Sequence, residues 1–292
     1  MRVAVYYRNS DVRIEDRPVP AIGEGEILVK VKASGICGTD VMEWYRIKKA
    51  PRILGHEISG EIVRSNSPDY KPGQRVFVSH HVPCFQCKFC KGGNHTACET
   101  LHTGNYDPGG YSEFIRVPSI NVLHGTYILP ENLSYEEGTM IEPLACVLRG
   151  QRVLQIKKGQ TVLILGCGVS GLMNIQTAQL AGVRIVATDV DDYRLKKAKE
   201  YGANEVYLPK DLPSLKAEKV ILCTGALPAL KQSFQSLDRK GTLLLFAIPD
   251  TDIQLPTVDF WRNEMTVTSS YGAAPDDLEQ AITLIASGKV NM

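Results

Sequence analysis

The sequence predicts an α/β protein with two domains, the second of which is built on a doubly wound, six-stranded parallel sheet. Three observations lead to this class. From about Gly150 onward, short apolar runs alternate with amphipathic segments, which is the pattern of successive β–α units. The first of these runs leads directly into the glycine-rich turn G-C-G-V-S-G and a helix. The length of 292 residues favours about two domains, since domains commonly hold roughly 100–200 residues.

The expected strands of the second half are short and rich in aliphatic residues. They cover residues 161–165, 184–188, 205–207, 219–223, 242–246 and 265–269. Six such strands complete a dinucleotide-binding sheet. The last expected element is the helix in D-D-L-E-Q-A-I-T-L-I-A, where Leu278, Ile282 and Ile285 share one face.

The charge balance argues against several classes of partner. Lys and Arg number 33 against 32 Asp and Glu, so no net field favours nucleic acid or a membrane surface. No apolar run approaches the roughly 20 residues that span a bilayer. The N-terminal segment lacks the apolar core of a signal peptide. We therefore expect a cytoplasmic protein with reduced thiols and with no nucleic-acid or membrane partner.

Four cysteines lie close together in P-C-F-Q-C-K-F-C-K-G-G-N-H-T-A-C. Cys84, Cys87, Cys90 and Cys98 follow the spacing C-x2-C-x2-C-x7-C. Four thiolates suit a closed tetrahedral Zn(II) shell that leaves no position for a substrate. The alternatives are a chance group of buried thiols and a zinc knuckle that binds nucleic acid, for which the flanks carry few cations and aromatic residues. The spacing therefore predicts a structural zinc lobe over about residues 80–102.

A second set of candidate metal ligands surrounds Cys37 in A-S-G-I-C-G-T-D and His56 in I-L-G-H-E-I-S-G. Both residues are next to glycine, in loops that follow β-like runs. A thiolate, an imidazole and one carboxylate can bind Zn(II) and leave a fourth position open for water or substrate. Glu57 and Glu142 compete for the carboxylate role. Taken singly, such residues are more often packed or hydrogen-bonded groups than metal ligands.

The glycine-rich turn indicates a dinucleotide site. Gly166, Gly168 and Gly171 form G-x-G-x-x-G, which permits a tight turn, close approach of a pyrophosphate and close helix packing. The helix N-terminus supplies free N–H groups to the phosphates. Asp189 ends the next strand and favours NAD over NADP, because a carboxylate there accepts from a ribose 2′-hydroxyl and repels a 2′-phosphate. Arg194 is close enough in sequence to soften that repulsion, and it is otherwise a surface helix residue.

Three further residues are assigned to the cofactor site from their places in the turn and at strand ends: Val169, Thr224 and Ile248. Right-handed crossovers place the ends of parallel strands on one edge of the sheet. Ordinary loop and strand-end roles are the alternative for these positions.

The motifs in their order resemble the zinc-dependent medium-chain alcohol and polyol dehydrogenases. C-G-T-D, G-H-E-x2-G, the four-cysteine spacing and E-P-L-A follow one another at similar distances, and the likeness covers nearly the whole chain. E-P-L-A is closer to the sorbitol- and threonine-dehydrogenase branch. The resemblance implies a GroES-like, mainly-β catalytic domain over residues 1–148 and an NAD-binding Rossmann domain over residues 149–292.

The resemblance also implies two zinc ions per chain, one structural and one catalytic. Cys37 and His56, with one or both of Glu57 and Glu142, would hold the catalytic zinc. The implied reaction is hydride transfer from a secondary alcohol, of the polyol or hydroxy-amino acid type, to NAD.

Two neighbouring residues take supporting roles by the same resemblance. Asp40 would orient His56, and Thr39 would pass the substrate proton. Asp40 can equally be a turn or N-cap residue, and Thr39 a turn former. Met42 stands where relatives commonly carry a histidine of the proton relay, so the relay would need water or another group.

The chain stops at L-I-A-S-G-K-V-N-M, where relatives return to complete their first domain, so the usual C-terminal return segment is expected to be lacking. A homo-oligomer, a dimer or a tetramer, is then expected to cover the exposed region. The alternative is a zinc- and nucleotide-binding protein that is inactive or impaired because of the shortened C-terminus.

Overall fold

The computed structural model describes residues 1–292, which form two compact units. Unit 1 comprises Met1–Ala145 together with Gly272–Met292, and unit 2 comprises Cys146–Tyr271. The boundary expected from the sequence, between residues 148 and 149, lies close to the observed division between Ala145 and Cys146. No helix of either unit is both long and apolar enough to cross a bilayer.

The final segment differs from the sequence-based assignment, which placed it in the second domain. It carries α11 (Pro275–Ala286), the helix expected from the sequence, and its contacts group it with unit 1. The Asn132 side-chain amide of unit 1 donates to the Ala286 carbonyl oxygen at 2.8 Å. Leu278 and Ile285 of α11 are buried. An amphipathic pattern predicts that a helix face is covered, but it does not say by which unit.

Unit 1 is mainly β, as expected. Its strands form a three-stranded sheet and a five-stranded sheet, each with antiparallel neighbours. The first has the order β2 (Asp11–Asp16), β1 (Arg2–Arg8), β4 (Arg52–Ile53), and the second has the order β7 (Phe114–Val117), β3 (Ile27–Ser34), β5 (Glu57–Ser65), β6 (Arg75–Ser79), β8 (Thr126–Ile128). Ile27 and Val29 of β3 are buried and pack with Ile58, Ile62 and Val76 in the core of this unit.

Apart from α11, the helices that lie wholly in unit 1 are short connections between strands. They are η1 (Gly38–Asp40), α1 (Glu43–Arg46), η2 (Ile47–Lys49), α2 (Lys88–Lys91), η3 (His95–Ala97), α3 (Glu99–Thr103), α4 (Ser119–Gly125) and α5 (Tyr135–Thr139). The start of α5 follows from a capping box, in which Ser134 Oγ accepts from the Glu137 N–H at 3.1 Å and the Glu137 carboxylate accepts from the Ser134 N–H at 2.8 Å. A longer helix, α6 (Ile141–Leu154), begins in unit 1 and ends in unit 2.

Unit 2 contains the six-stranded parallel sheet that the sequence predicts. Its order is β11 (Glu205–Tyr207), β10 (Arg184–Thr188), β9 (Thr161–Leu165), β12 (Ala217–Leu222), β13 (Leu237–Leu245), β14 (Thr266–Ser269). Every neighbouring pair is parallel. From β9 the chain first adds strands on one side, β10 and β11, and then on the other side, β12 to β14, as in a doubly wound fold. The connecting helices are α7 (Val169–Leu180), α8 (Asp192–Glu200), η4 (Pro209–Asp211), α9 (Leu227–Ser236) and α10 (Thr257–Asn263).

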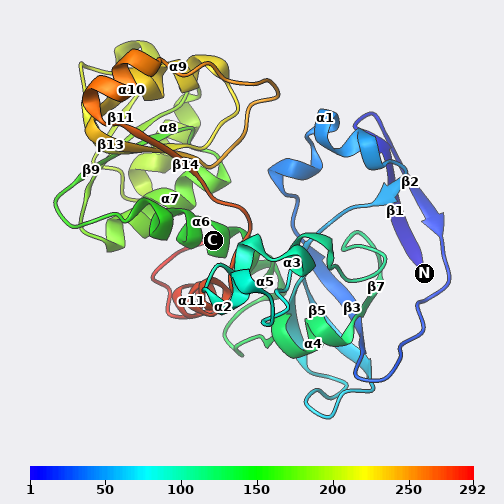
Figure 1. Cartoon of the computed structure of the whole chain (residues 1–292). Helices are drawn as coiled ribbons and strands as arrows, with labels where there is room; N and C mark the ends of the chain where they lie inside the picture. Colours follow the sequence, from blue (N-terminus) through cyan, green and yellow to red (C-terminus); the bar gives the residue numbers. More distant parts are fainter. The chain divides into compact units, whose positions relative to one another are not determined.

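Both faces of this sheet are covered, which explains why its strands are continuously apolar (Figure 1). On β9, Val162 and Ile164 belong to one buried cluster with residues of α7 and α8. Leu163 and Leu165 belong to a second cluster with residues of α9 and α10. The carboxyl ends of β9 and β12 therefore meet at one edge, where the glycine turn lies.

Candidate metal sites and cofactor turn

The four-cysteine lobe, formed by Cys84, Cys87, Cys90 and Cys98, brings its sulfur atoms together as the spacing predicts. All four Sγ atoms lie within 4.8 Å of one another, and all eight cysteines of the chain are free thiols. Backbone N–H groups point at the sulfurs: Cys84 donates to Cys98 Sγ at 3.4 Å and Cys87 donates to Cys84 Sγ at 3.3 Å. Such donors favour the thiolate form that a metal requires.

The pKa values of the lobe follow this arrangement. Burial raises the pKa of Cys98, but N–H groups of Cys84 and Leu101 outweigh burial and lower it to about 6. The N–H groups of Gln86 and Cys87 lower the pKa of Cys84. Burial raises the pKa of Cys90 to about 12. A lobe with two thiols disposed to ionise is chemically suited to a cation.

A second group of donors joins Cys37, His56 and Glu57, whose ligand atoms also lie within 4.8 Å of one another. We call it the three-donor site. It arises from strand pairing: β3 and β5 are antiparallel, and the Gly35 N–H after β3 donates to the Glu57 carbonyl oxygen at 2.7 Å. Cys37 follows β3, while His56 and Glu57 lie at the start of β5. The pairing therefore brings residues distant in sequence to one place.

Gly35 is a residue of this site that the sequence analysis missed. A Cβ atom at Gly35 would lie 2.3 Å from Glu57 Oε2, well inside contact distance. Any larger residue would displace the carboxylate from the other two donors. The glycine two positions before Cys37 was the available signal.

Burial and the neighbouring charges raise the pKa values of the acids in this site. Burial, and then the charges of Glu142 and Glu57, raise the pKa of Cys37 to about 12. Burial and the charge of Glu142 raise the pKa of Glu57 to about 8. Glu142, in the first turn of α6, is buried and acts on both groups, but its oxygens lie outside the three-donor set. Several acids buried together in this way need a positive charge to ionise together.

Asp40 lies beside His56 and also closes the turn that carries Cys37. Its Oδ1 lies 3.6 Å from His56 Nδ1, which leaves His56 Nε2 as the atom for a metal. Its Oδ2 accepts from the Cys37 N–H at 3.2 Å and from the Tyr111 hydroxyl at 2.8 Å. The capping role is therefore observed in the same carboxylate that lies beside His56, while the orienting role stays a prediction. Tyr111 was missed because nothing near it in sequence connects it to Cys37.

Thr39 and Met42 lie in the short segment after Cys37. The Thr39 hydroxyl is 3.3 Å from Cys37 Sγ and 2.6 Å from Arg46 Nη2. Met42 precedes α1 and is half-buried. His80, at the end of β6, packs against His56 with ring centroids 4.8 Å apart, and its Nδ1 has no hydrogen-bond partner. The sequence analysis did not identify His80, for which the adjacent H-H pair was the only signal.

The cofactor turn has the glycine geometry that the motif requires. Gly166 has a φ of +97°, which favours glycine. A Cβ atom at Gly171 would lie 2.0 Å from the Gly166 carbonyl oxygen, so only glycine permits this packing. Gly168 has no atom within 4 Å of its Cβ position and is the N-cap of α7, with exposed Val169 as the first helical residue. This open space at a helix N-terminus fits a pyrophosphate.

Asp189 is fixed beside the turn by two backbone donors. Its Oδ2 accepts from the Cys167 N–H at 2.7 Å, and its Oδ1 accepts from the Asp191 N–H at 3.0 Å. Arg194 Nη1 lies 4.0 Å from Asp189 Oδ2, with 54% of the Arg194 side chain exposed. Both residues named for ribose recognition therefore lie together next to the glycine turn.

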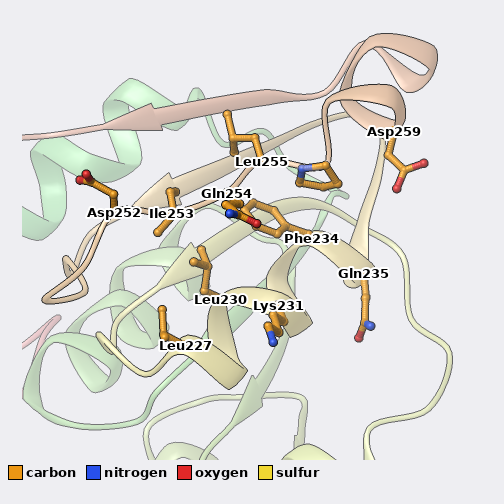
Figure 2. Close-up of a pocket in the computed structure, with 11 residues that line it drawn as sticks. Leu227, Leu230, Lys231, Phe234, Gln235, Asp252, Ile253, Gln254, Leu255 and Asp259 are labelled. Carbon is orange, nitrogen blue, oxygen red and sulfur yellow. The ribbon is translucent and has the colours of Figure 1, made fainter.

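Thr224 and Ile248 lie at the same edge. The Cβ position of Gly166 is 3.2 Å from Thr224 Cβ, and that of Gly225 is 2.9 Å from the Ile248 carbonyl oxygen. A hollow of about 550 Å³ lies elsewhere in unit 2, between α9 and residues 252–259 (Figure 2). No residue named for the metal or cofactor sites lines it.

The residues present fit zinc at both thiol sites. Zn(II) ligands lie about 2.0–2.3 Å from the ion, so tetrahedral ligand atoms are roughly 3.3–3.8 Å apart. Both donor sets, with atoms within 4.8 Å, are near this spacing without any large rearrangement. The lobe offers four sulfurs, whereas the three-donor site offers one sulfur, one nitrogen and one oxygen.

Two family profiles match the chain. The profile described as "Alcohol dehydrogenase GroES-like domain" matches residues 23–130, and the profile described as "Zinc-binding dehydrogenase" matches residues 170–287.

Curated relatives match almost the whole chain. An L-galactonate-5-dehydrogenase of Escherichia coli is 32% identical over 310 residues, covering 99% of this chain and 88% of the relative. A sorbitol dehydrogenase of Bacillus subtilis is 31% identical over 315 residues, covering 100% of this chain and 87% of the relative.

Solved structures are similar as well. A Sinorhizobium meliloti structure, described as a zinc-binding dehydrogenase bound to NADP, has a TM-score of 0.87 at 28% identity, covering 100% of this chain and 90% of that chain. An Escherichia coli structure, described as a short chain alcohol dehydrogenase complexed with NADH, has a TM-score of 0.87 at 26% identity, covering 100% of this chain and 89% of that chain.

Proposed function

This chain belongs to the zinc-dependent medium-chain polyol dehydrogenases, and on that premise we propose that it oxidises a secondary alcohol of a polyol or a hydroxy acid with NAD as hydride acceptor. It is an oxidoreductase of this family, with zinc and a nicotinamide as cofactors. The relatives named for sorbitol and galactonate support a substrate with several hydroxyl groups. The alternative of an inactive binding protein is not favoured, because these relatives are dehydrogenases.

The observation that carries this proposal is the mixed three-donor site. A fourth protein ligand would close the shell, whereas Cys37, His56 and Glu57 leave a position for a substrate oxygen. Bound there, zinc would supply a Lewis acid for the substrate hydroxyl, and the nicotinamide would accept the hydride. The chain itself contributes the three donors, and Asp40 fixes the ring of His56. Four thiolates in the lobe would hold a second, structural zinc.

Glu142 remains a candidate ligand under this proposal. Its carboxylate is buried and acts electrostatically on Cys37 and Glu57, so it lies near enough to the site to be weighed as a ligand of the zinc that these residues would hold. We propose Glu57 as the third donor because its oxygen already lies in the set.

NAD is proposed over NADP because of Asp189. Its side chain is only 5% exposed and is held in place by two backbone N–H groups, so the carboxylate cannot swing away from a 2′-phosphate. The buried anion therefore disfavours NADP, and exposed Arg194 offsets it only in part.

The proposal is tested by metal analysis and by cofactor reduction with a panel of polyols and hydroxy acids. We expect two zinc ions per chain and reduction of NAD by at least one polyol. A single zinc held by the lobe, or no reduction by any member of the panel while NAD still binds, would contradict it. Sedimentation of the same sample tests the homo-oligomer, which stays a prediction.

The cofactor preference has its own test in Asp189→Asn. Loss of a charged hydrogen-bond acceptor is expected to weaken NAD by about 10- to 100-fold and to narrow its advantage over NADP. Arg194→Gln is the matched control and should weaken NADP more than NAD. The ratio of kcat/KM values for the two cofactors is the measurement, and an unchanged ratio in Asp189→Asn would reject NAD selection by this residue.

A further inference from the structure

Arg46 ends α1, and its guanidinium reaches three oxygen atoms beside the three-donor site. Nε donates to the Thr39 carbonyl oxygen at 2.8 Å, while Nη2 donates to Thr39 Oγ1 at 2.6 Å and to Asp40 Oδ1 at 3.1 Å. The side chains are largely buried, with 15% of Arg46 and 4% of Asp40 exposed. A guanidinium that is buried with a carboxylate and two further acceptors has one fixed orientation.

The acceptors of Arg46 lead to two different metal donors. Asp40 Oδ1, which accepts from Arg46, is also the atom 3.6 Å from His56 Nδ1. Thr39 Oγ1, which accepts from the same Arg46 nitrogen, lies 3.3 Å from Cys37 Sγ. One guanidinium is therefore linked to the nitrogen donor through Asp40 and to the sulfur donor through Thr39.

These contacts determine what the Thr39 hydroxyl can do. A guanidinium only donates, so the hydroxyl oxygen accepts from Arg46. The single hydrogen of the hydroxyl is then directed to Cys37 Sγ, which as a thiolate only accepts. That hydrogen is therefore not free to be passed on when the hydroxyl accepts a proton from a substrate alcohol. Its contacts are those of a group that supports the sulfur donor.

Arg46 is itself held from the other side. Its guanidinium carbon lies 5.0 Å from the centre of the Tyr45 ring. Asn9, in the turn after β1, anchors α1 by donating its N–H to the Glu43 carboxylate at 2.8 Å and its side-chain amide to the Val41 carbonyl oxygen at 2.8 Å. The segment that carries Arg46 is therefore anchored to the turn after β1.

We propose that Arg46 is a positioning residue for the open metal site, which fixes Cys37 through Thr39 and His56 through Asp40 in the arrangement that binds one ion. The proposal rests on the proposed function, because it needs zinc at the three-donor site. It changes the role of Thr39 from passing the substrate proton to supporting the Cys37 sulfur. Three acceptors bound by one planar guanidinium are a geometry that an ammonium group cannot reproduce.

The test compares Arg46→Lys, Arg46→Gln and the control Lys49→Gln in the full-length, zinc-loaded protein. Lys49 is an exposed cation three residues away that makes no hydrogen bond to Thr39 and no ion pair with Asp40, so its variant removes a nearby charge of the same sign. Zinc release to a chelator is measured per chain. The zinc of the four-cysteine lobe is an internal control for folding, since the Arg46 side chain makes no hydrogen bond to the lobe.

We expect both Arg46 variants to lose one zinc about 10- to 100-fold more readily than wild type, while the lobe zinc is retained. In the cobalt-loaded protein, the thiolate-to-cobalt charge-transfer band should shift in both Arg46 variants, and Lys49→Gln should match wild type. Thr39→Val should shift the same band. These readouts do not depend on turnover.

Three results would overturn the inference. Wild-type zinc retention in Arg46→Lys would show that charge alone suffices, and an unchanged cobalt spectrum in Arg46→Gln would show that Cys37 is not positioned by Arg46. A spectrum of Thr39→Val identical to wild type, with kcat reduced, would return Thr39 to proton transfer. In each of these cases wild type still holds two zinc ions, so the proposed function stands. Wild type with only the lobe zinc would overturn both.

Discussion

The four-cysteine lobe and the three-donor site lie in the same unit, and both gather ligand atoms within 4.8 Å, yet they differ in how they are built. The lobe takes all its donors from one local stretch, Cys84 to Cys98, and its own backbone N–H groups stabilise the sulfurs. The three-donor site takes its donors from the end of β3 and the start of β5, two paired strands that are separated in sequence.

The support around the two sites differs in the same way. Around the three-donor site the support comes from side chains, with Asp40, Tyr111, Thr39 and Arg46 forming a connected set of hydrogen bonds. Around the lobe the donors are mainly backbone groups. A closed set of like ligands organises a loop, whereas an incomplete set of unlike ligands needs a rigid frame so that the remaining position stays usable.

Replacing one cysteine at each site gives the largest expected contrast. Cys37→Ser should remove one zinc and lower kcat/KM by about a thousandfold or more, because loss of the ion removes several kcal/mol of transition-state stabilisation. Its thermal unfolding midpoint should stay near that of wild type. Cys98→Ser should lose the other zinc and lower the free energy of unfolding by several kcal/mol, on the order expected for a structural zinc. Metal analysis, kinetics and thermal unfolding of both variants are the measurements. Equal losses of stability would remove the distinction between the sites.

Variants of Glu57 and Glu142 test which carboxylate belongs to the three-donor site. Glu57→Gln removes an anionic donor from the three-donor set, so we expect about 10- to 100-fold weaker zinc retention there. Glu142→Gln removes only a nearby charge and should have a smaller effect. The chelator-release rate and the cobalt spectrum of each variant provide the measurement. A larger effect of Glu142→Gln would make Glu142 the third ligand.

The fold and the lobe were largely predictable because their signals are local. Each strand of unit 2 is an uninterrupted apolar run, and parallel β–α units fix the sheet order once the strands are known. The cysteines of the lobe need only short loops to meet. Cys37 and His56, by contrast, meet only because β3 pairs with β5, and spacing alone contains no information about that pairing.

What the sequence did not give is the frame around the ligands. Tyr111 contacts Asp40 across more than seventy positions, and Gly35 matters only because of where the Glu57 carboxylate lies. Arg46 resembles any surface cation at the end of a short helix until its three acceptors are known. The location of α11 was also beyond reach, because a hydrophobic face does not specify its partner.

The smallest predicted effect concerns His80 and His81, whose contribution to the free energy of unfolding depends on pH. His80 and His81 follow β6 and precede the lobe. Burial, and then His81, lowers the pKa of His80 well below its ordinary value, while burial, and then His56, lowers the pKa of His81 to about 3. In the unfolded chain histidine titrates near about 6.5, so below that pH the unfolded state binds more protons than the folded state.

The free energy of unfolding should therefore fall as the pH is lowered below about 6.5, by up to about 1.4 kcal/mol per histidine for each pH unit. Urea unfolding of the zinc-loaded protein between about pH 7.5 and about pH 5.5 measures this slope. His81→Asn removes one of the two titrating histidines, so the free energy of unfolding should change less steeply with pH in this variant than in wild type. All other titrating groups are the same in the two proteins. Identical slopes would mean that His81 binds protons as readily in the folded protein as in the unfolded chain, and a neutral His81 packed between the lobe and the three-donor site would be contradicted.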